Sequence, residues 1–480
     1  MLEKLKIKWV YGICIAFIAI NSLLIINEMY WLSTLPLAVL ILIIFFFRLD
    51  VFLLLLAFLT PLSLKLTDPD LNIGLALPTE PLLFGVMALF LIRSIYYRDY
   101  PNVAMRHFVS VSIIIYLLWM FFTTVTSSIP MVSFKFFLSK LWFIVPLYFF
   151  AILLFRDTKR IKQFIWISVM AMLIVVIYTI YNHWLFNFDE KIGHWVMSPF
   201  YNDHTAYGAA LAMFIPFMFG FVLDKSQSKT IRLFAFFVFA ILVLAIILSY
   251  CRAAWVSLAG ALGVFLILKF KINYKFVIAG LIAVIGIFLI YQSEIIMNLE
   301  KNKQDTSKDY VEHIQSISNI STDASNLERI NRWQSAFRMF KERPITGWGP
   351  GTYQFKYAPF QYSKEKTIIS TNTGDLGNAH SEYIGPLAEQ GVLGMLSFVL
   401  LAVAVIYTAV KVYKRSNSTT VKNLSLLSLL GLVTYYIHSL LNNFLDTDKL
   451  SVPFWSFIAI IVALDITHVS KEVETGKSEV

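Results

Sequence analysis

The chain has 480 residues, of which 58% are hydrophobic and 15% are charged, and its mean hydropathy is +0.69. This composition excludes an ordinary soluble globular protein. The formal net charge of +10 could indicate a nucleic-acid-binding protein, but the Lys and Arg residues gather in alternate loops between apolar segments. We therefore expect a lipid bilayer as the partner of this chain, and no nucleic acid.

Long apolar segments, each bounded by short polar turns, recur along the chain. Each approaches the roughly 20 residues that a helix needs to cross the hydrocarbon core. The predicted spans are residues 9–26, 31–47, 50–66, 79–97, 107–126, 134–155, 161–182, 204–223, 231–250, 252–269, 274–292, 391–412, 424–442 and 452–468. Apolar and polar residues do not alternate as they do in a β-barrel. We therefore expect an all-α polytopic membrane protein with about 12–14 transmembrane helices.

The basic residues predict how the spans are oriented. They fall in every second loop, for example at Arg156 and Lys159 and again at Lys225 and Lys229. The positive-inside rule assigns those loops and both termini to the cytoplasm, so the long polar loop at 293–382 is expected outside. The basic N-terminus and the apolar run after it have no convincing small-residue cleavage site, which predicts an uncleaved first helix.

The long loop divides the chain into three predicted segments. These are N-terminal transmembrane helices at 1–292, a large loop with a reactive motif at 293–382, and C-terminal transmembrane helices with a cytoplasmic tail at 383–480. A loop of this size can fold a site at the boundary between water and lipid. His380 lies near its end, and histidine is the side chain best suited to move a proton near neutral pH.

Helix signals inside the loop are firmest from Asp323 to Arg343. On a helical wheel one apolar arc forms, and Arg329 lies within it. The arc consists of Ile330, Trp333, Ala336, Phe337 and Phe340. An arginine in the middle of such an arc needs an anion or a water-filled cleft. Pro344 ends the helix, and the glycines of 347–351 predict tight turns in preference to a phosphate cradle.

Charged residues in or beside the spans are functional candidates, because charge is costly inside a bilayer. Arg252 opens a span at its outer end, where few other basic residues lie. Lys140 lies about six residues into its span, where both snorkelling and a functional role are open. His438, with Asn442 one turn later, is expected to hydrogen-bond between helices. His, Cys and carboxylate residues do not show the spacing of metal ligands, so no metal or cofactor is predicted.

Several of these residues together resemble the signature of the O-antigen ligase and polymerase superfamily. They are Arg329 with Trp333 and Ala336, the run Pro344-Ile345-Thr346-Gly347-Trp348-Gly349, and His380-Ser381 followed by Gly391 and Gly394. Arg252 in its Ser-x-x-Arg-Ala-Ala setting resembles the start of a helix in that family. The resemblance covers at least residues 249–394. It departs from the family at Ser381, where Asn often follows the histidine, and in the large number of predicted spans.

The resemblance implies an enzyme that transfers a glycan from undecaprenyl diphosphate to an acceptor hydroxyl. The reaction would take place without a metal at the periplasmic face of the bacterial inner (cytoplasmic) membrane. His380 would deprotonate the acceptor hydroxyl. Arg252, Arg329 and Lys140 would bind the donor diphosphate, since guanidinium is always charged and can grip phosphate oxygens in a bidentate way.

The sequence leaves several functions open. The first is an O-antigen ligase, which joins a finished polysaccharide to a sugar of the lipid A core. A polymerase that joins repeat units, and a protein O-oligosaccharyltransferase, share the same donor chemistry. A flippase for lipid-linked oligosaccharides belongs to another class and would also place basic residues inside the membrane. Paired interrupted helices in matching halves would favour transport, and the sequence shows none. A non-catalytic assembly scaffold would leave Arg252 and Arg329 unexplained.

Overall fold

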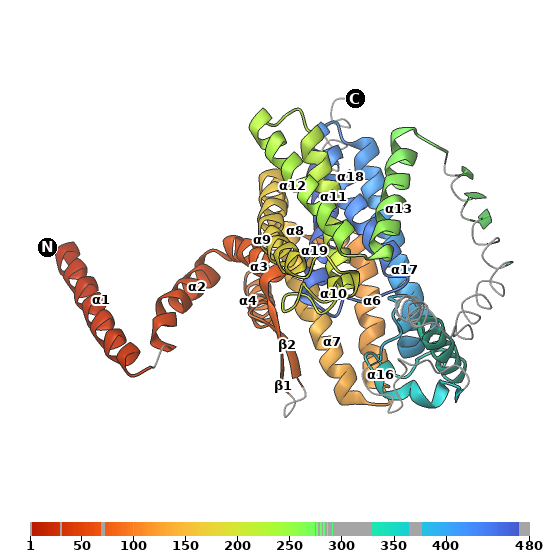
Figure 1. Ribbon diagram of the computed structural model, residues 1–480, viewed down its shortest axis with the longest axis horizontal. Helices are drawn as coiled ribbons and strands as arrows, with labels where there is room; N and C mark the ends of the chain where they lie inside the picture. Colours follow the sequence, from red (N-terminus) through yellow and green to blue (C-terminus); the bar gives the residue numbers. More distant parts are fainter. Residues whose placement is uncertain are drawn as a thin grey trace. The chain divides into compact units, whose positions relative to one another are not determined.

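A computed structural model describes residues 2–28, 31–68, 73–98, 100–273, 328–363 and 377–469, with scattered positions between 275 and 290 (Figure 1). By internal packing the chain separates into two units, Met1–Leu56 and Ala57–Val480. The first unit holds α1 (Leu2–Ile26), a 3-10 turn at Trp31–Thr34, α2 (Leu35–Phe47) and the first part of α3 (Leu49–Leu62). All the candidate functional residues predicted from the sequence lie in the second unit. The three-part division of the sequence at 292 and 382 stays a prediction.

Ten helices in the described part of the chain are long and apolar enough to cross a membrane, which confirms an all-α polytopic membrane protein. They are α4 (Thr79–Tyr97), α6 (Phe108–Val125), α7 with α8 (Pro130–Ile144 and Ala151–Leu154), α9 (Thr158–Leu185), α11 (His204–Leu223), α12 (Lys229–Leu248), α13 (Arg252–Lys269), α17 (Ile384–Arg415), α18 (Thr419–His438) and α19 (Asp448–Leu464). One-turn helices α5 (Asn102–Met105), α10 (Glu190–Gly193) and α16 (Tyr353–Lys356) lie between them, as does a 3-10 turn at Ala358–Phe360. A π-helical segment at Asp465–Val469 continues α19.

Some predicted spans differ from the structure. Span 31–47 contains a helix of 13 residues, α2, and span 50–66 contains one of 14 residues, α3. Both are shorter than the roughly 20 residues that a perpendicular crossing requires. Span 274–292 falls largely outside the described residues. Span 9–26 lies in α1, where the apolar helix found in the described residues is the shorter Cys14–Ile26. The described residues therefore support ten spans, fewer than the fourteen expected.

A β-hairpin follows α3 where the sequence predicted the end of a span. Strand β1 (Leu64–Asp68) pairs antiparallel with β2 (Ile73–Leu77), and Leu64 lies opposite Leu77. The sequence of β1, Leu-Lys-Leu-Thr-Asp, alternates apolar and polar residues, which is the pattern of a strand. The prediction that such alternation is absent was wrong at this point.

Two membrane helices depart from regular geometry. Between α7 and α8 the chain forms a π-turn at Val145–Phe150, where Pro146 lacks the N–H that an α-helical bond needs. In α17, Gly391 has φ 70° and ψ −170°, so the chain breaks between a first short helix and the long one that crosses the membrane. The predicted span at 391–412 therefore begins where the regular helix begins.

Helices α18 and α19 form the centre of the bundle. In their most apolar windows, 78% of α18 and 89% of α19 is buried, against 17% of α13. Glycine allows close packing here: a Cβ at Gly431 of α18 would lie 2.7 Å from the carbonyl oxygen of Met213 in α11. Small residues of this kind let membrane helices approach closely. Helix α13, by contrast, is a peripheral wall.

The two ends of the bundle differ. At one end, here called the loop face, α6, α9, α12 and α18 finish and α7, α11, α13, α17 and α19 begin. The described residues of the long loop join α17 at this end. The basic loops before α9 and α12 lie at the other end, here called the opposite face.

Candidate active site

A cavity of about 460 Å³ lies at the loop face, and we call it the arginine cavity. Its lining comes from α10, from the starts of α11 and α13, from the end of α18 and from the loop helix at 328–342. The lining residues are Glu190, His194, His204, Thr205, Tyr250, Cys251, Arg252, Ala253, Val256, Arg329, Ile437, Leu441 and Asn442. The cavity thus joins segments that are far apart in the sequence.

Two of the predicted phosphate ligands, Arg252 and Arg329, meet in this cavity. Arg252 is the first residue of α13 and is exposed. Arg329 lies in the first turn of the loop helix, where burial lowers the pKa of its guanidinium while Cys251 and Asp203 act to raise it. The N-terminus of α11 reaches the same cavity and adds a positive helix dipole. The arrangement suits an anion.

The lining also contains two histidines that were not among the predicted site residues. His194 and His204 stack with ring centroids 4.1 Å apart and planes 17° apart. Burial lowers the pKa of His194, which favours its neutral form. Asp203 accepts hydrogen bonds from the backbone N–H groups of Thr205 and Ala206 and so caps α11. The signal in the sequence was the short polar stretch at 183–203, which contains His183, His194 and Asp203.

His380 lies beside the arginine cavity rather than on its lining. Its backbone is left-handed, with φ 48°, which is uncommon for a residue other than glycine. The N–H of His380 donates to Oδ1 of Asn378 at 3.1 Å and helps to hold this turn. Burial, with the positive charges of Arg332 and Arg329 acting in the same direction, lowers the pKa of His380 to about 3. The imidazole is therefore neutral at physiological pH.

Arg332 links the loop helix to the turn that carries His380. Its Nε donates to Oε1 of Glu328 at 2.9 Å, and its Nη1 donates to the carbonyl oxygen of Asn378 at 3.1 Å. Gly377 leaves room for this guanidinium, since a Cβ there would overlap it. Tyr357 lies under the guanidinium, 5.4 Å from the ring centroid. Arg332 thus fixes where the His380 turn stands relative to Arg329.

The sequence analysis missed Arg332 because it searched for an apolar stripe. The loop helix exists at 328–342, in line with the predicted helix. Its buried stripe, however, consists of Glu328, Asn331, Arg332, Ser335, Ala336 and Met339. Only Ala336 belongs to both this stripe and the predicted apolar arc, and Phe337 of the arc is 44% exposed. The helix packs through polar contacts to the His380 turn, so hydropathy alone pointed to the wrong face.

The glycine run 347–351 packs the loop against the break in α17 at Gly391. Gly347, Gly349 and Gly351 all have positive φ, which confirms the predicted tight turns. The N–H of Gly349 donates to the carbonyl oxygen of Glu389 at 2.7 Å. A Cβ at Gly347 would overlap the backbone of Glu389, and one at Gly391 would overlap the carbonyl of Ile345. These glycines are needed for close backbone approach.

A second cavity, of about 170 Å³, is lined by residues on both sides of His380 in the sequence, and we call it the carboxylate cavity. Asn378, Ala379, Ser381 and Glu382 all line it. The remaining lining residues are Tyr116, Phe136, Lys140, Gly351, Tyr353, Gln354, Gly385, Pro386, Glu389, Gln390, Asn443 and Asp446. No described residue lines both cavities.

Lys140, the third predicted phosphate ligand, belongs to the carboxylate cavity. Its Nζ donates to the carbonyl oxygen of Leu445 at 2.6 Å and lies 5.0 Å from the ring centroid of Phe136. The side chain is buried, so it does not snorkel to the surface. The structure brings Arg252 and Arg329 together but places Lys140 with Glu382 and Glu389 instead.

The other histidine singled out in the sequence has a local partner. His438 Nε2 lies 3.2 Å from Nδ2 of Asn442, one turn further along the chain. Asn442 lines the arginine cavity, and His438 is buried behind it. The polar contact predicted for His438 is therefore present, to a residue just beyond the end of α18.

The fold and the two cavities define a polytopic membrane protein with a cationic and an acidic cavity side by side at one face. Comparison with known proteins finds a family that resembles part of this chain. Residues 235–399 match the family model described as O-Antigen ligase. Arg252, Arg329 and His380 all lie inside the matched region, whereas Lys140 lies outside it.

A bacterial relative is similar to this chain over about half of its length. An uncharacterized protein of Haemophilus influenzae is 25% identical to this chain over 237 residues. The match covers 48% of this chain and 56% of the relative, so the chain spans about half the length of the curated relative that it matches.

Proposed function

We propose that this protein transfers a glycan from a polyprenyl diphosphate, undecaprenyl diphosphate in bacteria, to an acceptor hydroxyl at the loop face. The observation that carries the proposal is the convergence of Arg252 and Arg329 on one cavity beside the His380 turn. Two cations near a helix N-terminus suit a diphosphate. The O-antigen ligase model matches the same stretch of chain.

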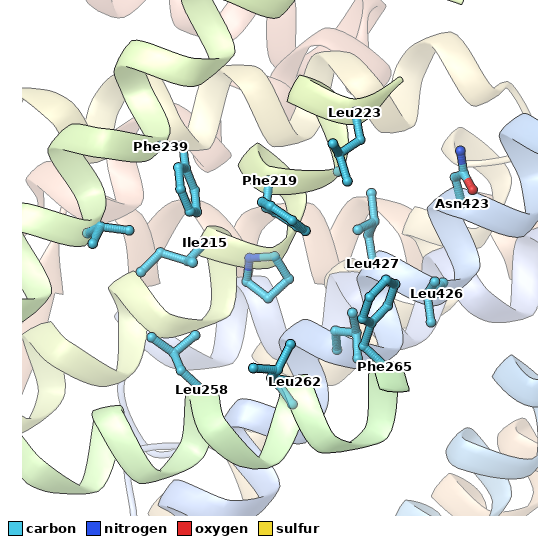
Figure 2. A pocket seen from close by; sticks show the side chains of 15 residues that line it. Ile215, Phe219, Leu223, Phe239, Leu258, Leu262, Phe265, Asn423, Leu426 and Leu427 are labelled. Carbon is cyan, nitrogen blue, oxygen red and sulfur yellow. The ribbon is translucent and has the colours of Figure 1, made fainter. Parts of the chain in front are cut away.

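An apolar groove next to the arginine cavity suits the lipid part of such a donor. Its volume is about 410 Å³, and its lining comes from α11, α12, α13 and α18. Figure 2 shows Phe219, Leu262 and Leu427 turned toward this common space from three of these helices. Asn423 is the most polar residue of the lining.

The groove and the arginine cavity lie along the same two helices. On α13 the order is Arg252 and Val256 in the cavity, then Leu258 and Leu262 in the groove. On α18 the groove residues likewise precede the cavity residues at the end of the helix. A prenyl chain in the groove would therefore present its diphosphate to the arginines.

In the proposed reaction, the His380 imidazole accepts the proton of the acceptor hydroxyl. The hydroxyl oxygen attacks the anomeric carbon of the donor glycan, and the bond from that carbon to the diphosphate breaks. The leaving diphosphate keeps the electron pair, next to Arg252 and Arg329. Its charge also offsets the arginine fields, and so raises the pKa of His380 when the donor is bound. A neutral but weakly basic imidazole thereby becomes a better base in the donor complex.

The orientation of the protein follows from charge. Basic residues gather at the opposite face, for example Lys159 and Arg160 in the first turn of α9 and Lys414 and Arg415 at the end of α17. The positive-inside rule would make that face cytoplasmic and the loop face periplasmic. Nucleotide sugars are absent there, so a lipid-linked donor is the reasonable source of an activated glycan.

The test is transfer by the purified protein in lipid nanodiscs, with an undecaprenyl-diphosphate-linked glycan as donor. Release of undecaprenyl diphosphate that depends on an added glycolipid acceptor would support the proposal. Movement of the donor across a liposome bilayer without any new glycosidic bond would instead make the protein a flippase.

Among glycan transfers we favour ligation of a finished chain to the lipid A core or another glycan acceptor. A deletion strain separates the related reactions. Loss of attachment with long chains still on the lipid carrier means ligation, and accumulation of single repeat units means polymerisation. Loss of glycan from Ser or Thr of a protein means protein O-glycosylation.

A further inference from the structure

The carboxylate cavity has no part in the donor chemistry described above. It is nonetheless a formed polar cavity at the same face, next to the His380 turn. Three acidic residues line it, Glu382, Glu389 and Asp446, together with the single cation Lys140. The one cation among these carboxyl groups, Lys140, already donates to the Leu445 carbonyl, so this cavity does not offer a diphosphate the two arginines of the other cavity.

Most of the charged groups in the cavity are held by the protein. Glu382 Oε1 accepts hydrogen bonds from the Tyr435 hydroxyl and from the N–H of Leu445, both at 2.9 Å. Glu389 Oε1 accepts from the N–H of Tyr353 at 2.9 Å. A carboxylate has about four acceptor positions, so each keeps capacity for a further donor. The cavity is therefore a rigid set of hydrogen-bond acceptors.

Two side-chain amides give an independent sign of a ligand. Gln390 is only 1% exposed, and within the described structure its Oε1 has no hydrogen-bond partner. Asn443 Oδ1, from another residue of the lining, is also buried without one. Leaving a buried acceptor unpaired is costly, so such groups mark a place where something else donates to them.

The shape and the remaining walls narrow the class of ligand. A dry cavity of about 150 Å³ holds one benzene molecule, so 170 Å³ suits a single six-membered ring. The aromatic rings of Tyr116, Phe136 and Tyr353 supply apolar surface between the acceptors. Directional acceptors set among aromatic walls match a pyranose, which offers several hydroxyl donors around an apolar ring face.

We infer that the carboxylate cavity binds the sugar ring of the acceptor, with Gln390, Asp446 and the glutamates accepting hydrogen bonds from its hydroxyls. The role of this sugar as the acceptor rests on the proposed function. The binding of a sugar can be measured whether or not that function is correct. The His380 turn then separates the two substrates. Its residues Asn378, Ser381 and Glu382 face the sugar, while His380 stands next to the arginines.

The experiment measures sugar binding directly. Full-length protein in lipid nanodiscs is titrated with the methyl glycosides of glucose, galactose and N-acetylglucosamine, and binding is followed by saturation-transfer difference NMR. The key variant is Gln390→Met, which keeps the length of the side chain and removes the unpaired oxygen. Asp446→Asn at the exposed rim is the second variant. Glu342→Gln, an exposed carboxylate of the loop helix, is the matched control.

We expect at least one glycoside to bind to the wild-type protein. Gln390→Met should weaken that binding by about tenfold, and should leave the thermal unfolding temperature unchanged or raised, because it removes an unsatisfied buried acceptor. Asp446→Asn should weaken it less, and Glu342→Gln not at all. A purely structural Gln390 would give the reverse: lower stability and unchanged sugar binding, which overturns the inference.

Transfer and undecaprenyl diphosphate binding, measured on the same variants, separate the two proposals. If transfer occurs and neither cavity variant changes glycoside binding or the KM for acceptor, the inference fails and the proposed function stands. If the variants weaken glycoside binding while no glycan is ever transferred, the sugar site stands and the proposed function fails.

Discussion

The arginine cavity and the carboxylate cavity lie near the same short turn, yet their linings differ. One holds Arg252 and Arg329, at the starts of α13 and of the loop helix, and shares α11, α13 and α18 with the apolar groove. The other is lined by three acidic residues, by side-chain amides and by aromatic rings from the loop and from α17. Two guanidinium groups suit a diphosphate, whereas hydrogen-bond acceptors between aromatic walls suit a neutral sugar. The chemistry of the two linings would therefore sort a lipid-linked donor from a sugar acceptor.

The largest effect on transfer is expected from replacing His380, the residue near both cavities. His380→Asn should reduce transfer by roughly 10²–10⁴-fold, the usual worth of a positioned acid–base group. Asparagine is chosen because it tolerates the left-handed backbone at φ 48°, so a folding defect is avoided. Donor and sugar binding should both persist. His107→Asn, at the cap of α6 on the opposite face, is the control, and substantial transfer by His380→Asn would reduce this histidine to a structural role.

The next largest effect is expected in the arginine cavity. Arg329→Lys and Arg252→Lys should each weaken undecaprenyl diphosphate binding by roughly 10–10²-fold, since an ammonium does not reproduce the bidentate guanidinium contact. Binding of methyl glycosides should not change. Arg232→Lys, whose guanidinium donates to the Val222 carbonyl, is the matched substitution away from both cavities. Equal loss of donor and sugar binding would show that the two cavities are not separate sites.

Lys140 sharpens the comparison, because it was expected to bind phosphate and lies with the carboxylates. Lys140→Met removes the hydrogen bond to Leu445 and leaves Glu382 and Glu389 without their nearby cation. We expect a lower thermal unfolding temperature and a several-fold higher KM for acceptor, with unchanged binding of undecaprenyl diphosphate. A selective loss of donor binding would return Lys140 to the phosphate site.

A pH profile tests whether the donor activates His380. In the free protein burial and two arginines lower the pKa of His380 to about 3, below its ordinary value of 6.5. Protonation therefore removes the base only in strongly acidic solution. The kcat/KM for donor, which reports the free enzyme, should show no acid limb from His380 between about pH 5 and 7, the range in which an ordinary histidine titrates.

The donor complex should behave differently. Because bound diphosphate raises the pKa of His380, the acid limb of kcat is expected at higher pH than that of kcat/KM. The lowered pKa also affects the stability of the fold. Below about pH 6.5 the unfolded chain binds a proton at His380 that the folded state does not bind, so the free energy of unfolding falls as the pH drops toward 3. His380→Asn should flatten part of that fall. Coincident acid limbs would exclude activation of the base by donor.

The smallest expected effect is that of metal removal. The proposed reaction uses the two arginines for charge and His380 for the proton, so a chelator should leave transfer unchanged. The measurement is the rate of the purified wild-type protein with and without EDTA. Loss of transfer that Mg²⁺ or Mn²⁺ restores would require a metal in the arginine cavity.

The sequence predicted the arginine site better than the carboxylate site, for a physical reason. Arg252 and Arg329 each occupy a place where a cation is costly, so each signals an anion even without knowledge of the other. Lys140 satisfied the same criterion, but its acceptor is the Leu445 carbonyl, 305 residues away. Local sequence does not contain a contact of that separation.

Other differences between prediction and structure arise from the number of residues over which each sequence pattern is read. A window of about 20 residues finds spans but averages over the five alternating residues of β1. A helical wheel finds apolar stripes, whereas the loop helix packs through Glu328, Arg332 and Ser335. The ten confirmed spans were all predicted within a few residues of their ends, because each is a long apolar run with charged or turn residues at its borders.

The left-handed backbone at His380 leaves a trace that natural variation can reveal. Histidine is retained at φ 48° against a steric cost that glycine and asparagine scarcely experience. In descendants of this chain that have lost the need for a base, selection on shape alone would remain. Such lineages should drift toward Gly or Asn at this position, and rarely toward Val or Ile. The identity of this one residue would then distinguish active proteins from those that have lost activity among genome sequences.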